Sequence, residues 1–188
     1  MYNSFMDLAK RFPKKVKTKK AREVTLRIPD EGDVKEMQRF INELVEEDAP
    51  ILKNEKIKLT DEKKYLEGLL KEIKSKKSVN VYAFYKSKLI ANTGVKVGKF
   101  RGKHMGNLGI SVSKDFRDEG LGQLLMKDLL FLAKNYLNLK KITLAVLDGN
   151  LRGIHLYKKM GFSEYGRLPE ANFYKGDYVD EILMYKDL

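Results

Sequence analysis

The chain has 188 residues, a formal net charge of +12 at pH 7, 43% hydrophobic residues and no cysteine. This length is typical of one domain of ordinary size with a sizeable apolar core. The absence of cysteine excludes disulfides, thiol nucleophiles and cysteine metal sites. No apolar run is long enough to span a bilayer, and the first residues lack a secretory signal pattern. We therefore expect a cytoplasmic protein that does not enter a membrane.

Positive charge is concentrated near the N-terminus. Residues 10–22 carry eight Lys and Arg side chains and no acid. We interpret residues 1–22 as a basic arm and residues 23–188 as the folded domain. Two roles are open for the arm. It is either a solvated segment that aids solubility, or an electrostatic contact to nucleic acid, the ribosome or another acidic partner.

The first half of the domain reads as a strand, two helices and a hairpin. Residues 23–28 alternate between apolar and polar side chains, which is typical of a strand. Asp33 is a candidate N-cap for a first helix, and Asp61 for a second. Residues 79–85 and 88–97 then form two strands whose spacing predicts a tight hairpin.

A glycine-containing junction connects the next strand and helix. Residues 105–112 alternate as a half-buried strand, and leucines recur at helical spacing over residues 121–136. The junction reads Arg117, Asp118, Glu119, Gly120, Leu121, Gly122. The first turn of a helix has unpartnered N–H groups and a positive dipole end, and glycines let a bulky anion approach. The junction therefore predicts a phosphate or diphosphate site, with Arg117 adding a charge-assisted contact. It matches neither the P-loop nor the dinucleotide fingerprint.

The remaining segments complete a crossover and a final pair of strands. Residues 141–147 are rich in strand formers, and a short helix starts near Asn150. A strand, a helix and a second strand in this order predict parallel pairing through a right-handed crossover. We expect the last two strands at residues 162–165 and 178–185, separated by a loop that contains Pro169 and Gly176.

Two motifs together resemble the GNAT superfamily of acyl-CoA-dependent N-acetyltransferases. Arg117-x-x-Gly120-x-Gly122 resembles motif A of this superfamily. A second motif, at the family's usual separation, consists of Asn150, Tyr157, Gly161 and Phe162. The resemblance covers about residues 23–188 and implies the GNAT acyl-CoA N-acyltransferase fold, an α/β fold with a central mixed sheet and helices on both faces. It also implies acetyl-CoA as co-substrate, no metal, and an amine acceptor.

The resemblance assigns parts of the coenzyme to parts of the chain. The diphosphate is expected on the backbone amides of residues 117–122. The pantetheine arm is expected beside Ile110, Ser111 and Val112, where their strand parts from residues 141–147. Backbone N–H groups left unpaired there would also stabilise the negative thioester oxygen. Asn150 is implied as a further coenzyme contact, although an asparagine before a helix is also a common N-cap.

Tyr157 is the candidate catalytic acid. It lies seven residues after Asn150, and this spacing places both side chains on nearly the same side of a helix. The resemblance implies that the tyrosine protonates the departing thiolate. The alternative is a core aromatic residue without a chemical role.

The general base is left open. An amine acceptor must lose a proton before or during attack. Many relatives have a glutamate near the position of Asn107, and an asparagine cannot accept a proton but can hold a water that relays one. His104 and His155 are the titratable alternatives nearby, and neither has a partner at metal-ligand spacing.

In relatives, the acceptor binds between the first two helices and the last hairpin. Acidic residues occur in both regions, and we select Glu46 and Asp177 as candidate acceptor contacts. The alternative is that these carboxylates belong to a solvated charged face.

The sequence thus predicts an N-acetyltransferase in which the amine attacks acetyl-CoA directly in a ternary complex, because no cysteine exists to form an acyl-enzyme. The acceptor is either a small amine, such as an amino acid, a polyamine or an antibiotic, or a protein N-terminus or lysine. The protein is expected to be a monomer or homodimer. The alternative function is a non-catalytic module that binds CoA, or binds nucleic acid through the basic arm.

Overall fold

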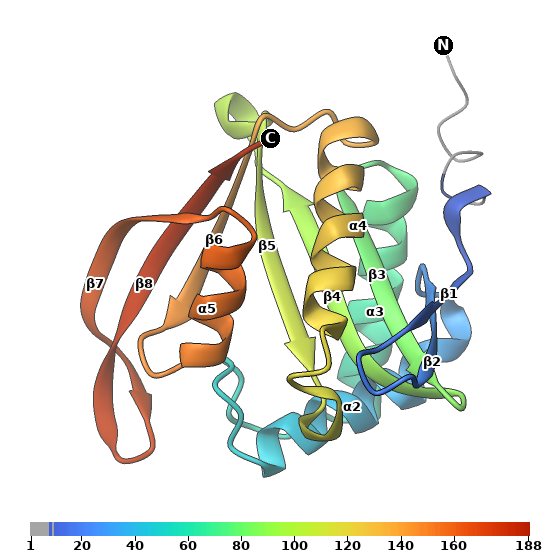
Figure 1. Cartoon of the computed structure of the whole chain (residues 1–188), viewed down its shortest axis with the longest axis horizontal. Coiled ribbons are helices and arrows are strands. Elements are labelled where there is room, and N and C mark those ends of the chain that lie inside the picture. Colours follow the sequence, from blue (N-terminus) through green and yellow to red (C-terminus); the bar gives the residue numbers. More distant parts are fainter. Residues whose placement is uncertain (1–7, 9) are drawn as a thin grey trace.

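The computed structural model describes residue 8 and residues 10–188. Within this part of the chain, the strands form one eight-stranded sheet in the order β1-β2-β3-β4-β5-β6-β8-β7 (Figure 1). The strands are β1 (Lys14–Lys17), β2 (Glu23–Arg27), β3 (Ser78–Tyr85), β4 (Lys88–Val97), β5 (Met105–Val112), β6 (Lys141–Leu147), β7 (Ser163–Tyr174) and β8 (Asp177–Asp187). The helices are α2 (Val34–Glu46), α3 (Leu59–Lys74), α4 (Leu121–Asn135) and α5 (Leu151–Lys159), and short 3₁₀ helices are η1 (Glu31–Asp33), η2 (Phe100–Gly102) and η3 (Lys114–Phe116). No helix of the described residues is long and apolar enough to cross a membrane.

The sheet is mixed because one pair of neighbouring strands is parallel. β5 and β6 run parallel, with α4 in the crossover between them. The other pairs, from β1·β2 to β7·β8, are antiparallel. The parallel crossover and the tight hairpin between β3 and β4, both predicted from the sequence, are confirmed.

Helices cover both faces of the sheet. On one face, α4 buries Leu121, Leu125 and Leu129 completely and packs against β3, β4 and β5. On the other face, α2 and α3 contribute Phe40 and Leu66 to a second cluster around Tyr82 of β3. Figure 1 shows α4 and α5 in front of the sheet and α3 behind it. The amphipathic spacing of each helix therefore matches the layer against which it packs.

The described part of the basic arm is folded into the domain. Lys14–Lys17 forms β1, which pairs along β2 at the edge of the sheet. Asp128 of α4 is only 4% exposed and accepts a hydrogen bond from Arg11 at 2.8 Å and one from Lys14 at 2.7 Å. For Arg11 and Lys14 the expectation of a solvated segment is wrong, because a buried acid pairs with their charges. Residues 1–7 and 9 of the arm lie outside the described residues. We propose that the folded domain begins before residue 23 and includes β1.

The last hairpin and two helix starts differ from the sequence predictions. β7 and β8 are longer than expected, and their turn is at Lys175 and Gly176. Pro169 lies within β7, where the pairing with β8 is irregular between Leu168 and Asn172. Proline has no N–H to donate, so it interrupts the ladder without ending the strand.

The predicted caps are also corrected. Asp33 makes no side-chain cap bond to α2. Instead, Asp30 accepts from Gly32 N–H and caps η1, which runs directly into α2. Asp61 lies inside the first turn of α3, which begins at Leu59.

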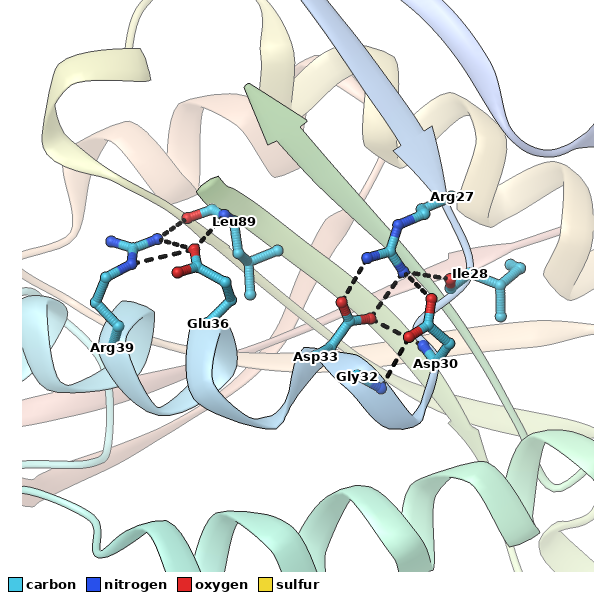
Figure 2. A network of polar contacts seen from close by, with 8 residues as sticks. All are labelled: Arg27, Ile28, Asp30, Gly32, Asp33, Glu36, Arg39 and Leu89. Atoms are coloured by element: carbon cyan, nitrogen blue, oxygen red, sulfur yellow. Dashed lines mark hydrogen bonds and ion pairs between the residues drawn. The ribbon is translucent and has the colours of Figure 1, made fainter. Parts of the chain in front are cut away.

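A polar network fixes α2 against the sheet (Figure 2). The buried Asp33 carboxylate accepts from Arg27 Nη1 of β2 at 2.7 Å and from the Asp30 backbone N–H at 2.8 Å. One turn later, Glu36 accepts from Leu89 N–H at 2.9 Å and Arg39 donates to Leu89 O at 2.7 Å. These bonds join α2 to β2 at one end and to β4 at its middle. They therefore set the place where the C-terminal end of α2 meets the site described below.

Replacing Asp33 by alanine should lower the free energy of unfolding by about 1–3 kcal/mol, because the Arg27 guanidinium and the Asp30 amide lose a charged acceptor. Urea denaturation of Asp33→Ala measures the change. Glu31→Ala, an exposed acid of the same 3₁₀ helix, is the matched control. Equal stability of the two variants would contradict this role for Asp33.

Candidate active site

A cavity of about 890 Å³ lies between β5, the start of α4, α5 and the segment that follows α2. Ten of the residues predicted for the site lie on its wall: Ile110, Ser111, Val112, Arg117, Asp118, Gly120, Leu121, Gly122, Asn150 and Tyr157. The wall does not contain Asn107, Glu119, Glu46 or Asp177. Segments that are far apart in the chain are thus brought together in one hollow of the molecule.

The start of α4 presents backbone donors to this cavity. Gly120 is the N-cap residue and has a left-handed backbone with φ of +79°, and no side chain caps the helix. Leu124 N–H donates to Gly120 O at 3.2 Å. The amides of Leu121, Gly122 and Gln123 precede this bond, and all three residues line the cavity. Their geometry fits an anion, because these amides lack the helical acceptors of later turns.

Gly122 allows a close approach between α4 and α5. A Cβ at this position would lie 3.0 Å from Leu156 Cδ2 of α5. The glycine therefore leaves room between two helices that both line the cavity. A larger side chain at position 122 would fill part of the cavity.

The second feature of the cavity is the parting of β5 and β6. Their pairing ends at Asn107 and Thr143, whereas β5 continues to Val112 and β6 to Leu147. A gap in the backbone ladder therefore opens beyond Asn107, as the sequence predicts.

The direction of the β5 backbone follows from its other neighbour. Ser113 N–H donates to Ile90 O at 2.8 Å, so residues 109 and 111 also direct their backbone groups toward β4. By the alternation of a strand, Ile110 and Val112 direct theirs toward the gap. Except for Val112 O, which accepts from Arg117 Nε, these are the backbone groups of β5 that an extended ligand could pair with, as an added strand does.

Arg117 has partners inside the protein. Its Nε donates to Val112 O at 3.0 Å, and its Nη2 pairs with the carboxylate of Glu47, just after α2. The side chain thus connects three walls of the cavity. The positive charge that the sequence analysis assigned to a bound phosphate is here shared with a carboxylate.

Glu119 points away from the cavity. Glu119 is 1% exposed, and its carboxylate accepts hydrogen bonds from Thr18 Oγ1 at 2.9 Å and from the Arg22 guanidinium. Lys20 Nζ lies 3.3 Å from the same carboxylate. The hydrogen bond from Arg22 is the main cause that lowers the pKa of Glu119 below its usual range. The loop before α4 is therefore held by an ion pair with residues of the basic arm.

Tyr157 is buried on the cavity wall and packs against Phe162, with ring centroids 6.0 Å apart. Burial raises the pKa of Tyr157 to about 12. The phenol therefore stays protonated at neutral pH, the form in which it can donate a proton or a hydrogen bond. Its position combines the two alternatives of the sequence analysis, because it is a core aromatic that also faces the cavity.

Asn150 caps α5 and also lines the cavity. Its Oδ1 accepts from Gly153 N–H at 2.9 Å, and its Nδ2 lies 3.4 Å from Pro50 O. Capping is thus one of its functions. The second bond links the start of α5 to the segment after α2, which narrows the cavity on this side.

Asn107 lies at the point where β5 and β6 part, but on the wall of a second cavity of about 450 Å³. α3, β3 and β4 supply most of that wall. Ile110 and Ser111 line both cavities, so this stretch of β5 is a wall that the two cavities share. Asn107 is therefore close to the gap in the sheet without sharing a cavity with Tyr157.

The two predicted acceptor residues are on the surface. Glu46 pairs with Lys56 at 2.6 Å, and Asp177 accepts from Tyr178 N–H at 2.8 Å. The cavity wall contains Glu47, Asp48 and Tyr174 from the same two regions, and the Tyr174 hydroxyl donates to Asp48 O at 3.0 Å. The last hairpin and the end of α2 therefore do meet at the cavity, but through neighbours of the selected residues.

Lys19 is a cavity residue that the sequence analysis did not identify. It belongs to the basic arm, and its alternating and charged surroundings carry no motif. Its place depends on the bonds from Thr18 and Lys19 to Glu119, which lies 101 residues after Thr18. Spacing in the sequence does not specify such a long-range contact.

Comparison with known proteins identifies the family. The model of the acetyltransferase (GNAT) family matches residues 39–162, a span that includes the start of α4, Tyr157 and most of the cavity wall. The chain belongs to this acetyltransferase family. Its mixed α/β sheet with helices on both faces is the fold of the family.

Named relatives match this chain over part of their length. The chain is 31% identical to the L-amino acid N-acetyltransferase AaaT of Escherichia coli over 84 residues. This span is 45% of this chain and 52% of that protein. The chain is 36% identical over 76 residues to a spermidine N(1)-acetyltransferase of Vibrio cholerae, 40% of this chain and 44% of that protein. The chain thus spans about half the length of the curated relatives it matches. A GNAT-family acetyltransferase from Streptococcus pneumoniae has a similar structure, with a TM-score of 0.79 and 25% identity over 88% of this chain and 99% of that one.

Replacing Glu119 by glutamine should lower the free energy of unfolding by about 1–3 kcal/mol at pH 7, because Arg22 loses its charged acceptor. The lowered pKa means that the carboxylate stabilises the fold above its unfolded pKa, near 4.5. The difference between the native chain and Glu119→Gln should therefore shrink as the pH falls below about 4.5.

Denaturant unfolding at pH 7 and pH 3.5 measures this difference. The exposed Glu67→Gln of α3 is the control. A difference that stayed constant across this range would contradict the ion pair as the source of stability.

Proposed function

We propose that this acetyltransferase transfers the acetyl group of acetyl-CoA to the primary amine of a small acceptor. The observation that supports it best is the continuity of one cavity. It joins the first-turn amides of α4, the open edge of β5 and the phenol of Tyr157.

The residues of this cavity fit the coenzyme. The amides of Leu121, Gly122 and Gln123 would hold the diphosphate, since they are donors at the positive end of a helix. The backbone of Ile110 and Val112 would pair with the amide groups of the pantetheine arm, because these strand groups face the gap between β5 and β6. Acetyl-CoA supplies the thioester carbonyl that the amine attacks.

The transfer involves bond changes at the thioester that the chain has to assist. The amine nitrogen attacks the carbonyl carbon, the bond from carbon to sulfur breaks, and the sulfur takes up a proton. Tyr157 would donate that proton or a hydrogen bond to the departing sulfur, since burial keeps its phenol neutral. A backbone N–H of the open β5 edge would stabilise the negative charge on the carbonyl oxygen.

The amine must also lose a proton. Asn107, at the apex of the gap, would hold a water that carries this proton toward the second cavity. An amide side chain can orient such a water through both its oxygen and its nitrogen.

For the acceptor, we propose an amino acid rather than a polyamine. A polyamine needs several unpaired carboxylates. On the cavity wall, Glu47 pairs with Arg117 and Asp118 with Arg152, which leaves Asp48. Lys159 and Lys175 line the cavity and would attract the carboxylate of an amino acid. The relatives include both an L-amino acid N-acetyltransferase and a spermidine N(1)-acetyltransferase, so this choice rests on the charges of the cavity.

The alternative of a nucleic-acid-binding arm receives less support. Arg11 and Lys14 are paired with Asp128, Lys15 with Glu23, and Arg22 with Glu119. Charges that are already paired within the chain release fewer counterions from a nucleic acid. Contact with a ribosome, the oligomeric state and a cytoplasmic location stay predictions.

Calorimetry with CoA tests the coenzyme site. The native chain should bind, and Gly122→Glu should bind at least about 100-fold more weakly, because the new carboxylate repels the diphosphate and fills the space beside Leu156. Gly68→Glu, where an added side chain meets open space on α3, is the matched control. Equal binding by the native chain and Gly122→Glu would place the coenzyme elsewhere.

Tyr157→Phe should lower kcat by about 100-fold and leave the Kd for CoA unchanged, because only the departing sulfur needs the hydroxyl. Initial rates with acetyl-CoA and a panel of L-amino acids, polyamines and N-terminal peptides measure the effect and identify the acceptor. Tyr165→Phe, an exposed residue, is the control. An unchanged kcat would remove the catalytic role of Tyr157, and turnover of polyamines alone would contradict the proposed acceptor class.

A further inference from the structure

The connection between β1 and β2 lies directly on the loop that precedes α4. Lys19 N–H donates to Glu119 O at 2.9 Å, and Thr18 and Arg22 both bind the Glu119 carboxylate. The contact therefore uses the backbone and the side chain of the same loop residue. It fixes the position of residue 19 relative to the first turn of α4.

The Lys19 side chain covers Gly120. Its Cγ and Cε each lie 3.4 Å from the position that a Cβ of Gly120 would occupy, and the residue lines the cavity beside the start of α4. The side chain is exposed, and no described carboxylate forms an ion pair with its ammonium group. Its neighbours in the same connection, Lys20 and Arg22, are both paired with Glu119.

The charge of Arg117, the basic residue within the loop itself, is shared with Glu47. Asp118 and Arg152 of the same wall pair with each other at 3.1 Å. A dianionic diphosphate on the amides of Leu121 and Gly122 would therefore need a cation whose charge is not already shared with an acid. Lys19 is the lysine that the fold carries to this place.

We propose that Lys19 is a phosphate-binding residue whose ammonium group pairs with the diphosphate of the coenzyme. This inference rests on the proposed coenzyme site. Thr18 and Arg22 act as positioning residues, because their bonds to Glu119 hold the connection over the loop. The basic arm thus contributes one cation to the binding of the co-substrate, and the rest of its described charge is used mainly in ion pairs within the chain.

Calorimetry with CoA and with 3′-dephospho-CoA tests this role. Lys19→Ala should weaken the binding of both ligands equally, by about five- to tenfold, because both contain the diphosphate. Lys19→Arg should retain most of the affinity. Lys17→Ala removes the same charge from an exposed position of β1 and should leave both affinities unchanged.

Three results would overturn the proposal. Unchanged affinities of Lys19→Ala would show that the side chain only covers Gly120. A loss confined to CoA would assign the ammonium to the 3′-phosphate instead of the diphosphate. Equal losses in Lys17→Ala would mean that net charge alone attracts the ligand. If the native chain bound neither ligand, the coenzyme site itself would be refuted, and this outcome is distinct from a failure of Lys19.

A double-mutant cycle tests the positioning role. Lys19→Ala should cost less affinity in a Glu119→Gln background than in the native chain, since the connection is then less firmly held over the loop. Additive effects would overturn the claim that Glu119 positions Lys19. Denaturant unfolding under the same conditions confirms that each variant is folded.

Discussion

The parting of β5 and β6 beyond Asn107 and Thr143 is the constraint on which the site depends. A strand that lacks a neighbour has unpaired backbone groups, and a buried polar group without a partner is costly. The cavity that opens there gives the edge of β5 access to water or to an extended ligand. α4 and α5 lie on the two sides of this gap (Figure 1). The segment at the end of α2 borders the cavity there, because Glu47, Pro50 and Asp48 bond to Arg117, Asn150 and Tyr174, respectively.

A second constraint concerns the loop before α4. Its glycines give the backbone freedom to form an anion site, but that freedom also makes its conformation costly to fix. Glu119 offsets this cost, because a buried carboxylate with Thr18 and Arg22 as donors has few alternative positions. The connection between β1 and β2 thus holds the loop before α4 and adds Lys19 to the cavity wall, although the family model matches only residues 39–162.

Charge is distributed in the protein in two different ways. Several bases of the basic arm meet acids of α4 and its preceding loop, such as Asp128, and contribute to folding. By contrast, Lys19, Lys159 and Lys175 line the cavity, where positive charge favours anionic ligands. A net charge of +12 therefore carries little information about partners until the internal pairs are known.

Elements with strong local patterns could be predicted from the amino-acid sequence: the hairpin of β3 and β4, the crossover through α4, and the glycines at its start. Hydrophobic period and turn chemistry are local properties, so they can be read from neighbouring residues. Through the family resemblance that two motifs carry, the sequence also selected ten residues of the cavity wall. The folded structure was needed to establish that residues 14–17 pair as a strand, that Arg117 pairs with Glu47, and that Lys19 lies over Gly120. These contacts join residues 70 or more positions apart or add a strand at a sheet edge, and their energies depend on burial and geometry that no local pattern specifies.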